Sequence, residues 1–418
     1  MSGQSAANTC RYGRLAMLLL ASLLCALGAT AAPLSTGNQN IDPAQVPKQA
    51  VMQVGPGRAI TTLREASRLA HDGMLIEVDA GRYFRDVTVW TQNNLTLRAV
   101  GGRVQLVAGG ASAENKATWV VRAQKFTVEG FDFEGAASTH HNGAGIRFES
   151  GSLRIRDCSF SYNQMGVLTG NDPGPTPQST IDIENSEFSH NGRPDGHNHQ
   201  LYVGRMARLT VTGSYFHHGR VGHLLKSRAA VSHIHYNRLT DELGGNSSYE
   251  LEFPDGGVAT VVGNLIVQGS QTQNPHLIAF GAESLHWPHN ELYLVNNTLV
   301  DNLPKGGVYL RTAPGTQIIK AVNNLLVGGK EALAPFKAGW VFNNFSADWD
   351  EFVLAAREDF RLKPGSRMRG RALDPGAGPK LPADLASEWS IVPRQEYRHP
   401  RQVSAPTAPS KNLGAFMQ

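Results

Sequence analysis

The stretches FTVEGFDF (126–133), LRIRDCSF (153–160), IDIENSEF (181–188) and LTVTGSYF (209–216) share one pattern. Each has a short run of alternating apolar residues, then Gly, Asn or Asp, and ends on a large apolar residue. The pattern recurs up to position 345, and its final residues are Phe133, Phe160, Phe188, Phe216, Leu239, Ile266, Leu299, Leu326 and Phe345. Most of the intervals between these residues are equal to within one position, so the chain is built from repeats.

A repeat of this length with strand-type alternation predicts an all-β fold, a single right-handed parallel β-helix of about 10 rungs. One rung cannot bury its own apolar face, so neighbouring rungs must stack. Asparagine tolerates the left-handed backbone of a tight turn, and stacked asparagine side chains can bond between rungs. A β-sandwich is the alternative, but its turns recur every 8–12 residues or so, roughly a third of the interval seen here. The signature of leucine-rich repeats is absent.

The segments on either side of the repeat fit a capped solenoid. Residues 63–70 form a short amphipathic stretch, and we expect a helix there that covers the N-terminal end, where a strand edge would otherwise be exposed. The β-helix domain is predicted to span residues 51–374. Residues 32–50 have the character of a linker. Residues 375–418 are rich in Pro, Ala and Ser, and we expect an irregular, poorly packed tail.

Residues 1–31 have the character of a signal peptide. Arg11 and Arg14 precede the apolar run LAMLLLASLLCALGA, and the sequence ATA at 29–31 is a small-x-small cleavage signal. This predicts an exported protein, periplasmic or extracellular. No later stretch is long and apolar enough to span a membrane. Cleavage leaves Cys158 as the only cysteine, which excludes an internal disulfide.

The net charge bears on the class of partner. The chain has 39 Lys and Arg against 35 Asp and Glu, and loss of the two arginines in the signal segment leaves a net charge of +2. Binding to nucleic acid needs a basic patch or stripe, so we expect no nucleic-acid partner. We also expect a monomer.

One part of the repeat, residues 197–255, is rich in ionisable groups and holds seven of the fifteen histidines. A scaffold that becomes ionisable over two or three rungs usually does so at a functional site. Because side chains alternate along a strand, we predict that His223 points inward and that one outer face carries the polar residues of successive strands. These residues are Arg147, Glu149, Gln200, Tyr202, Lys226, Glu250 and Glu252.

Such a face would be a groove of charged and hydrogen-bonding groups, the kind of surface that a linear acidic polysaccharide needs. The alternative is a solvated sheet face held by cross-strand ion pairs, such as Lys226 beside Glu250 or Glu252. The concentration of histidines on the flanking turns favours the functional interpretation.

Two patterns have the residues of a metal site. His197-x-His199 places both rings on the same side of a strand, as a zinc site needs, but no third ligand has suitable spacing. Glu250, Glu252 and Asp255 supply oxygen ligands close together, which favours calcium. If a metal is bound, we expect calcium at these three carboxylates.

Residues 51–374 resemble the pectate-lyase-like superfamily of secreted right-handed parallel β-helix proteins, through their asparagine-bearing rungs and opening segment. Within them, KSRAAVSHIHYNRL (226–239) followed by VVGNLI (261–266) resembles the alginate lyase and chondroitinase B family. That resemblance implies a lysine base at Lys226, an assisting arginine, and calcium against the uronate carboxylate. The family's arginine has no counterpart in the next rung, and its calcium-binding acids before the lysine are missing from VGHLL (221–225).

These residues predict a lyase that acts on a uronate-containing polysaccharide by β-elimination. The reaction needs a base for the C5 proton, a cation for the enolate-like charge and an acid for the leaving oxygen. Lys226 is the first candidate base. His223 and His199 are the alternatives, because the ordinary pKa of histidine is closer to neutral.

Tyr202 is the candidate acid, and Arg228, or Arg147 across the groove, is expected to meet the substrate carboxylate. Further substrate contacts are expected from Gln200, Glu250, Glu252 and His197. Three other functions stay open. They are a C5-epimerase that uses the same proton abstraction, a hydrolase with Glu250 and Glu252 as acid and base, and a non-catalytic glycan-binding or surface protein.

Overall fold

The computed structural model describes residues 49–170, 178–272, 274–329, 333, 339–381 and 390–417. All of them belong to one compact unit, Gln49–Gln418. The expected signal peptide, and the expected linker up to residue 48, lie outside the described residues. No helix within the described ranges is long and apolar enough to cross a membrane.

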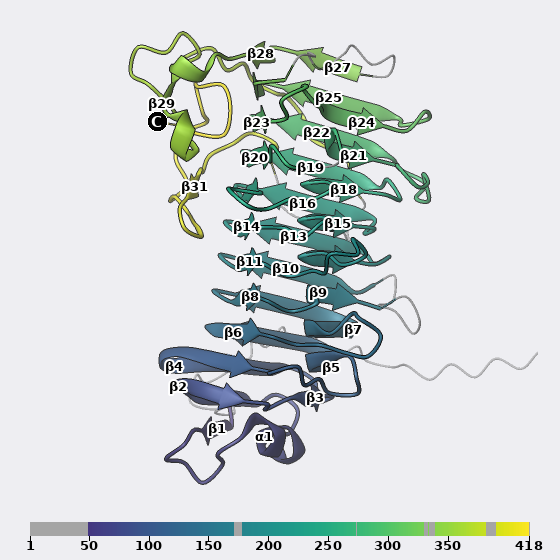
Figure 1. Ribbon diagram of the computed structural model, residues 1–418, viewed down its shortest axis with the longest axis vertical. Helices are drawn as coiled ribbons and strands as arrows, with labels where there is room; N and C mark the ends of the chain where they lie inside the picture. The colour runs from purple at the N-terminus through teal and green to yellow at the C-terminus, as the bar shows by residue number, and fades with distance from the viewer. Residues whose placement is uncertain are drawn as a thin grey trace, which may run out of the picture. The chain divides into compact units, whose positions relative to one another are not determined.

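The unit is an all-β parallel solenoid of about 10 turns with one short helix, as the repeat predicts (Figure 1). Its strands form three columns, which we name the first, second and third columns. Each strand pairs in parallel with the strand one turn earlier and one turn later, as β10 does with β7 and β13. The order first, second, third is repeated in every turn from β7 to β24.

The first column contains β1 (Val51–Val54), β2 (Leu75–Phe84), β4 (Leu95–Val107), β5 (Ala117–Glu129), β7 (Ala144–Arg156), β10 (Thr180–Glu184), β13 (Arg208–Thr212), β16 (Val231–His235), β19 (Val258–Val262), β22 (Glu291–Val295), β25 (Ile318–Val322) and β27 (Gly339–Phe342). The second column contains the ends of β2 and β4, then β6 (Phe131–Glu134), β8 (Ser159–Ser161), β11 (Glu187–Ser189), β14 (Tyr215–His217), β17 (Arg238–Thr240), β20 (Leu265–Gln268), β23 (Thr298–Asp301), β26 (Leu325–Val327) and β28 (Phe345–Ser346). The third column contains β3 (Thr88–Trp90), the first residues of β5 and β7, then β9 (Met165–Thr169), β12 (Leu201–Val203), β15 (Leu225–Ser227), β18 (Leu251–Phe253), β21 (His276–Phe280) and β24 (Val308–Thr312).

An asparagine ladder closes the turn between the first and second columns. The backbone N–H of Asn237 donates to the side-chain oxygen of Asn264 at 2.8 Å, and that of Asn264 donates to Asn297 at 3.0 Å. Asn297 donates in the same way to Asn324 at 2.8 Å. The residue before each of the last two asparagines has a left-handed backbone, with φ of 52° at Asn296. The predicted asparagine bonds between rungs are therefore confirmed.

Stacked side chains fill the interior beside this turn. The rings of Phe133, Phe160, Phe188 and Phe216 are fully buried and lie parallel, with centroids 4.9, 4.8 and 4.6 Å apart. The row continues with Leu239, Ile266, Leu299 and Leu326. Burial of one such side chain contributes roughly 1.5–3 kcal/mol. These are the residues whose spacing predicted the fold.

Helix α1 (Leu63–Leu69) lies at the N-terminal end of the stack, where a capping helix was expected (Figure 1). Thr62 begins it, and its hydroxyl accepts the backbone N–H of Glu65 at 3.1 Å. Leu63 and Ala66 are fully buried against the first turns of the solenoid. The helix therefore packs an apolar face onto the first strands.

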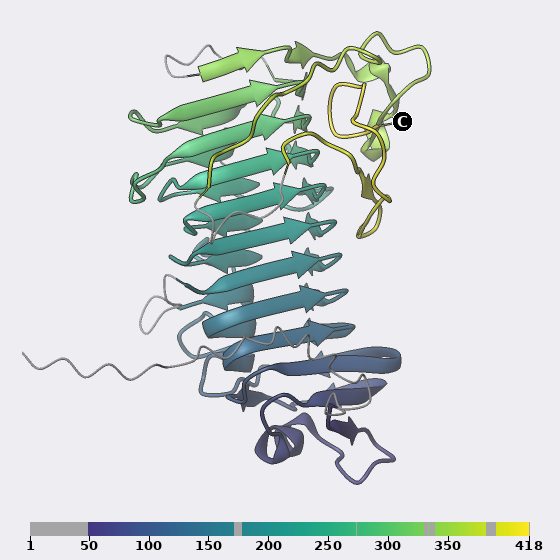
Figure 2. The same ribbon diagram turned by 180° about the vertical axis from the view of Figure 1, so that it is seen from behind.

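The C-terminal segment packs against the stack more closely than its composition led us to expect (Figure 2). Its elements are η2 (Trp349–Glu351), β29 (Phe352–Leu354), η3 (Ala355–Arg357), β30 (Asp359–Leu362), and a short hairpin of β31 (Tyr397–Arg398) and β32 (Gln402–Val403). The side chain of Asn296 donates to the carbonyl of Asn412 at 2.9 Å, and Arg401 donates to the carbonyl of Cys158 at 3.2 Å. Leu413 is fully buried. The described tail is thus irregular but packed, because apolar residues within it cover the turns.

Candidate functional site

The third column places polar side chains of adjacent rungs opposite one another. Tyr202 of β12 is in register with Lys226 of β15, and Lys226 with Glu252 of β18. Arg147 of β7 occupies the same position two rungs earlier. The residues preceding the first three are buried in the core; they are Leu201, Leu225 and Leu251. The alternation therefore predicts correctly that these polar side chains share the outer face.

The prediction was wrong for Gln200 and Glu250, which point into the solenoid. Gln200 accepts from the side chain of Asn191 and donates to the carbonyl of His217, both at 2.5 Å. Glu250 is fully buried, and this burial raises its pKa well above the ordinary value. Both residues precede the first residue of a strand, at a corner where simple alternation does not hold. Leu224 fills the same corner in the rung between them.

His223 faces outward, also in contrast to the prediction, because the corner at Leu224 shifts the alternation by one residue. The Nδ1 atom of His223 lies 2.9 Å from Oε2 of Glu252. The ring centroid of His223 lies 4.5 Å from that of His199 and 5.0 Å from that of Tyr249. Two rows thus run side by side, His199–His223–Tyr249 and Tyr202–Lys226–Glu252. We call them together the polar face.

A carboxylate from a surface loop closes onto the polar face. Glu283 follows β21 and is exposed, with Oε1 2.8 Å from Nζ of Lys226 and Oε2 accepting from Nη2 of Arg228 at 2.5 Å. Lys226 Nζ also lies 3.0 Å from Oε2 of Glu252, and Arg228 Nη1 donates to Asp255 at 2.6 Å. Lys226 and Arg228 are therefore bridged by a carboxylate that approaches from the surface.

Lys226 is held in its protonated form. Burial acts to lower the pKa of Lys226, but Glu252 and Glu283 outweigh it and raise the pKa above the ordinary value. For Glu252, burial acts to raise the pKa, whereas His223 and Lys226 lower it below the ordinary value. A protonated ammonium group cannot accept a proton, so this setting suits Lys226 to stabilise negative charge.

The two histidines of the polar face are neutral at neutral pH. Burial lowers the pKa of His223, and Glu252 offsets this only in part. Burial, followed by the charges of His223 and Lys226, places the pKa of His199 well below its ordinary value. Nδ1 of His199 accepts the backbone N–H of His223 at 3.0 Å, which puts the proton of His199 on Nε2. Nδ1 of His223 faces a carboxylate, which leaves Nε2 of His223 unprotonated.

Tyr202 of the polar face and Arg147 beside it are two further candidates for contact with a ligand. The hydroxyl oxygen of Tyr202 accepts from Nε of Arg228 at 3.0 Å, so its own proton is free to be donated. Among the described residues, Arg147 has no carboxylate within ion-pair distance, and its buried Nε has no hydrogen-bond partner. Burial lowers the pKa of Arg147. An arginine in this position can meet an acidic ligand without first losing an ion pair.

Comparison with known proteins bears on the fold. No protein-family model and no curated protein matches the sequence. Pectate lyase Pel9A superposes on 89% of this chain and 96% of its own, with 13% identity and a TM-score of 0.56. Two deglycosylated forms of the pectin methylesterase from Aspergillus niger cover 72% of this chain and 86% of their own, with 14% and 11% identity and TM-scores of 0.28 and 0.29. The latter scores are too low to carry an argument.

The chain has a parallel β-helix fold similar to that of pectate lyase Pel9A. The identity to pectate lyase Pel9A is low, so this likeness defines the scaffold and not the chemistry. The residues of the polar face must therefore carry any argument about activity.

The carboxylates expected to bind calcium do not converge. Glu250 points into the solenoid, while Glu252 and Asp255 are each held by positively charged side chains. For Asp255 these are Arg228 and Arg205, the latter at 2.7 Å. A calcium site needs several oxygen ligands that face one point, which this arrangement does not provide. His197, expected to contact substrate, is exposed and belongs to neither row of the polar face.

Sequence reasoning missed Glu283 and Arg205. Glu283 lies 57 residues from Lys226, and Arg205 lies 50 residues from Asp255, so neither pair is visible as a local motif. One signal was present for Glu283. Its turn contains the longest interval of the repeat, which indicates an inserted loop beside the polar face.

Proposed function

We propose that this protein is a secreted polysaccharide lyase that cleaves a uronate-containing polymer by β-elimination on the polar face. One observation carries the proposal, the exposed Glu283 carboxylate that bridges Lys226 and Arg228. A uronate carboxylate has the same two-oxygen geometry and would take the place of Glu283. The two cations are otherwise shielded, since the side chains of Lys226 and Arg228 are only 10% and 16% exposed.

β-Elimination first requires that the negative charge of the uronate carboxylate be neutralised. Loss of the C5 proton moves negative charge onto the carboxylate, and a bound ammonium and guanidinium stabilise that charge in the transition state. Lys226 serves here as a cation and not as the base, because its pKa is raised. The cation that the family resemblance assigned to calcium is then supplied by two side chains of this chain.

Nε2 of His223 is the base in this scheme. It takes the proton from C5, the electron pair of the C5–H bond forms the C4–C5 double bond, and the C4–O bond breaks. The leaving oxygen receives the proton of the Tyr202 hydroxyl. Oε2 of Glu252, 2.9 Å from Nδ1 of His223, stabilises the imidazolium that forms, as the carboxylate does in other histidine-carboxylate pairs.

The polymer class follows from charge and fold together. A linear polymer with a carboxylate on each residue matches a face that presents Lys226, Arg228 and Arg147, the last of which has no ion-pair partner among the described residues. The likeness in fold to a pectate lyase makes polygalacturonate the first substrate to test. Alginate and chondroitin sulfate are the next, because both contain uronate residues.

The test is an assay of the purified protein on these three polymers. We expect ultraviolet absorbance from an unsaturated uronate to rise with one of them, and to rise equally in Lys125→Ala, which alters an exposed lysine of the first column. New reducing ends without that absorbance would indicate hydrolysis, and altered C5 configuration without cleavage would indicate epimerisation. Binding without any change in the polymer would make the protein a glycan-binding module. Each of these three outcomes contradicts the proposal.

A further inference from the structure

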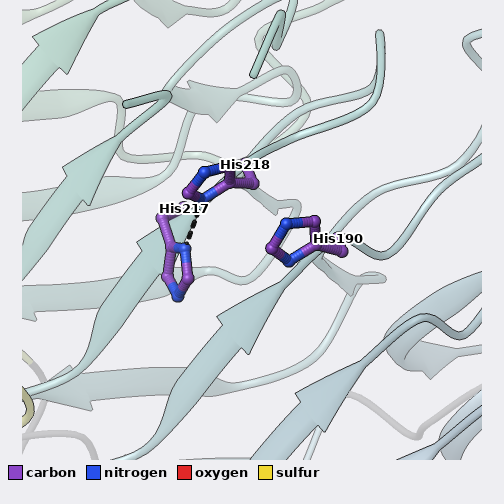
Figure 3. A group of neighbouring side chains, drawn as sticks. All are labelled: His190, His217 and His218. Atoms are coloured by element: carbon purple, nitrogen blue, oxygen red, sulfur yellow. Dashed lines mark hydrogen bonds between the residues drawn. The ribbon is translucent and has the colours of Figure 1, made fainter. Parts of the chain in front are cut away.

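Three histidines gather where the strands of the second column end (Figure 3). The polar face lies on the third column. His217 ends β14, and His218 follows it directly. Ser189 of β11 is in register with His217, so His190 and His218 occupy equivalent positions in successive rungs. Both have a left-handed backbone, with φ of 55° and 50°. The repeat itself therefore brings imidazoles of two rungs together.

The ring nitrogens are close enough to share a ligand. Nδ1 of His217 lies 2.6 Å from Nδ1 of His218, and the rings of His190 and His218 stack with centroids 4.4 Å apart. One nitrogen from each of the three rings lies within 4.8 Å of the other two. His190 and His218 are half-buried, so the cluster is open to solvent on one side.

A second observation points to a metal ion. Nε2 of His217 lies 3.2 Å from Oε1 of Glu187, one rung earlier in the same column. The other carboxylate oxygen of Glu187 lies 3.5 Å from Nη1 of Arg401, which holds the carboxylate in place. A histidine that binds a metal through one nitrogen almost always gives its other N–H to a carboxylate or carbonyl. Glu187 thus favours the tautomer that leaves Nδ1 of His217 unprotonated, where it shares a hydrogen bond with Nδ1 of His218 (Figure 3) that a metal ion would replace.

We propose that His190, His217 and His218 bind one divalent transition-metal ion of the zinc class. Neutral imidazole is a preferred ligand for such ions, and three protein ligands leave a further position for water or another small ligand. A tetrahedral ion with nitrogen ligands at about 2.0–2.1 Å would space the nitrogens about 3.3 Å apart. Two of the nitrogens lie 2.6 Å apart and all three lie within 4.8 Å of one another, so rotation of the rings would bring the nitrogens to that spacing. The bound ion would tie two successive turns together.

The test uses untagged full-length protein, stripped with a chelator and dialysed, and titrated with Zn²⁺ in a calorimeter. We expect one ion to bind per chain and the melting temperature to rise with Zn²⁺. Bound Co²⁺ should give the visible absorption bands typical of a four-coordinate ion. His190→Ala and His217→Ala should abolish both signals, and His140→Ala, which alters an exposed histidine elsewhere, should leave them unchanged.

Glu187→Gln is the sharper variant, because it keeps all three imidazoles. Loss of an outer carboxylate partner lowers metal affinity about 10- to 100-fold. Circular dichroism of each metal-free variant shows whether it is folded. His217 is the more buried histidine, so His190→Ala provides a second variant in case His217→Ala disturbs the fold. Failure of the folded wild-type protein to bind one Zn²⁺, or binding that survives in folded His190→Ala and His217→Ala, would overturn the proposal.

Discussion

The outer face of the first column and the polar face of the third column are both ladders of alternating charge. In the first column, Glu77, Arg98, Glu129 and Arg156 follow one another in register, and Arg98 and Arg156 pair with their neighbours at 2.7 and 3.1 Å. Their arginine side chains are 46% and 50% exposed. In the third column the side chains of Lys226 and Glu252 are only 10% and 3% exposed.

The difference shows why charge alternation alone does not identify a site. Exposed cross-strand pairs gain little, about 0–1 kcal/mol each, and explain the first ladder completely. Burying a lysine and a glutamate costs desolvation free energy, which their ion pair barely offsets. Stability alone therefore does not explain the second ladder. Two neutral histidines and a carboxylate from a surface loop surround it, whereas within the described residues Arg98 and Arg156 of the first ladder pair with carboxylates of adjacent strands. The comparison can be tested at both ladders.

The largest effect is expected at the base. His223→Ala should lower kcat on the cleaved polymer by about 10²–10⁴-fold, because a positioned proton-transfer group typically contributes that much. Arg98→Ala, in the first ladder, should leave kcat unchanged. Initial rates from the ultraviolet absorbance of the product measure both. Equal activity in His223→Ala and Arg98→Ala would remove the distinction between the two ladders as far as catalysis is concerned.

The second prediction concerns stability. Glu252→Gln leaves Lys226 with only the exposed Glu283 and removes the negative charge beside His223. Removal of one partner from a buried ion pair costs about 3–5 kcal/mol, and the remaining pair puts Glu252→Gln near the lower end. Glu77→Gln in the first ladder should cost at most about 1 kcal/mol. Thermal and guanidinium unfolding of both variants give the comparison. Similar losses in the two would mean that burial does not separate the ladders.

The third prediction concerns pH and rests on Glu250 and Glu252, two residues apart in the chain. Burial, and next the charge of Asp241, raise the pKa of Glu250 well above its ordinary value, whereas Glu252 is outward and ionised. Burial also raises the pKa of Asp241 to about 6. A raised carboxyl pKa means that the folded protein retains a proton that the unfolded chain releases. The contribution of these carboxyl groups to the free energy of unfolding should therefore fall as pH rises above the ordinary value of 4.5, toward the raised pKa. Histidines with a lowered pKa, such as His199 and His223, act in the opposite sense below the ordinary histidine value of 6.5, so the effect of Glu250 is measured as a difference between variants.

The slope should be up to about 1.4 kcal/mol per pH unit for each such group. Glu250→Gln keeps the shape of the side chain without the titrating proton, so stability should fall less, or rise more, with pH than in the wild type, by the contribution of one group. Melting temperatures between about pH 5 and pH 8 measure it, with Glu77→Gln, in the first ladder, as the control. The same pH dependence in wild type and Glu250→Gln would contradict the inward position of Glu250.

The same pair of glutamates shows how far the sequence predicts the structure. The nearly constant interval of the repeat predicts the solenoid, because each turn must place its apolar residue on that of the turn before. Strand alternation then predicts the outward row of Tyr202, Lys226 and Glu252. It fails at Gln200 and Glu250, because rung corners, and not strands, orient those side chains.

Contacts made by loops cannot be predicted from the repeat or from strand alternation, and the cause is different. Glu283 comes from an inserted loop with no repeat position, so its meeting with Lys226 depends on a loop path that no local pattern encodes. The histidine cluster is different, since His190 and His218 are separated by one full repeat, like the stacked phenylalanines two positions before them. Comparing ionisable residues at the repeat interval would have found this cluster from the sequence.

The smallest effect is expected at Glu283, and it tests the observation on which the proposed function rests. In Glu283→Gln the neutral amide no longer competes with the substrate carboxylate for Lys226 and Arg228. The side chain of Glu283 is 48% exposed, so its pairing is screened by solvent and is worth at most about 1 kcal/mol, or a fewfold change in affinity. We therefore expect KM to fall about two- to fivefold with kcat nearly unchanged, because the base and the acid are not altered. Glu77→Gln, which likewise frees an arginine but on the exposed ladder, should leave KM as it is. Steady-state kinetics on the cleaved polymer measure both variants. A rise in KM for Glu283→Gln would show that this carboxylate helps to bind the polymer, and that the cations do not receive the substrate carboxylate in its place.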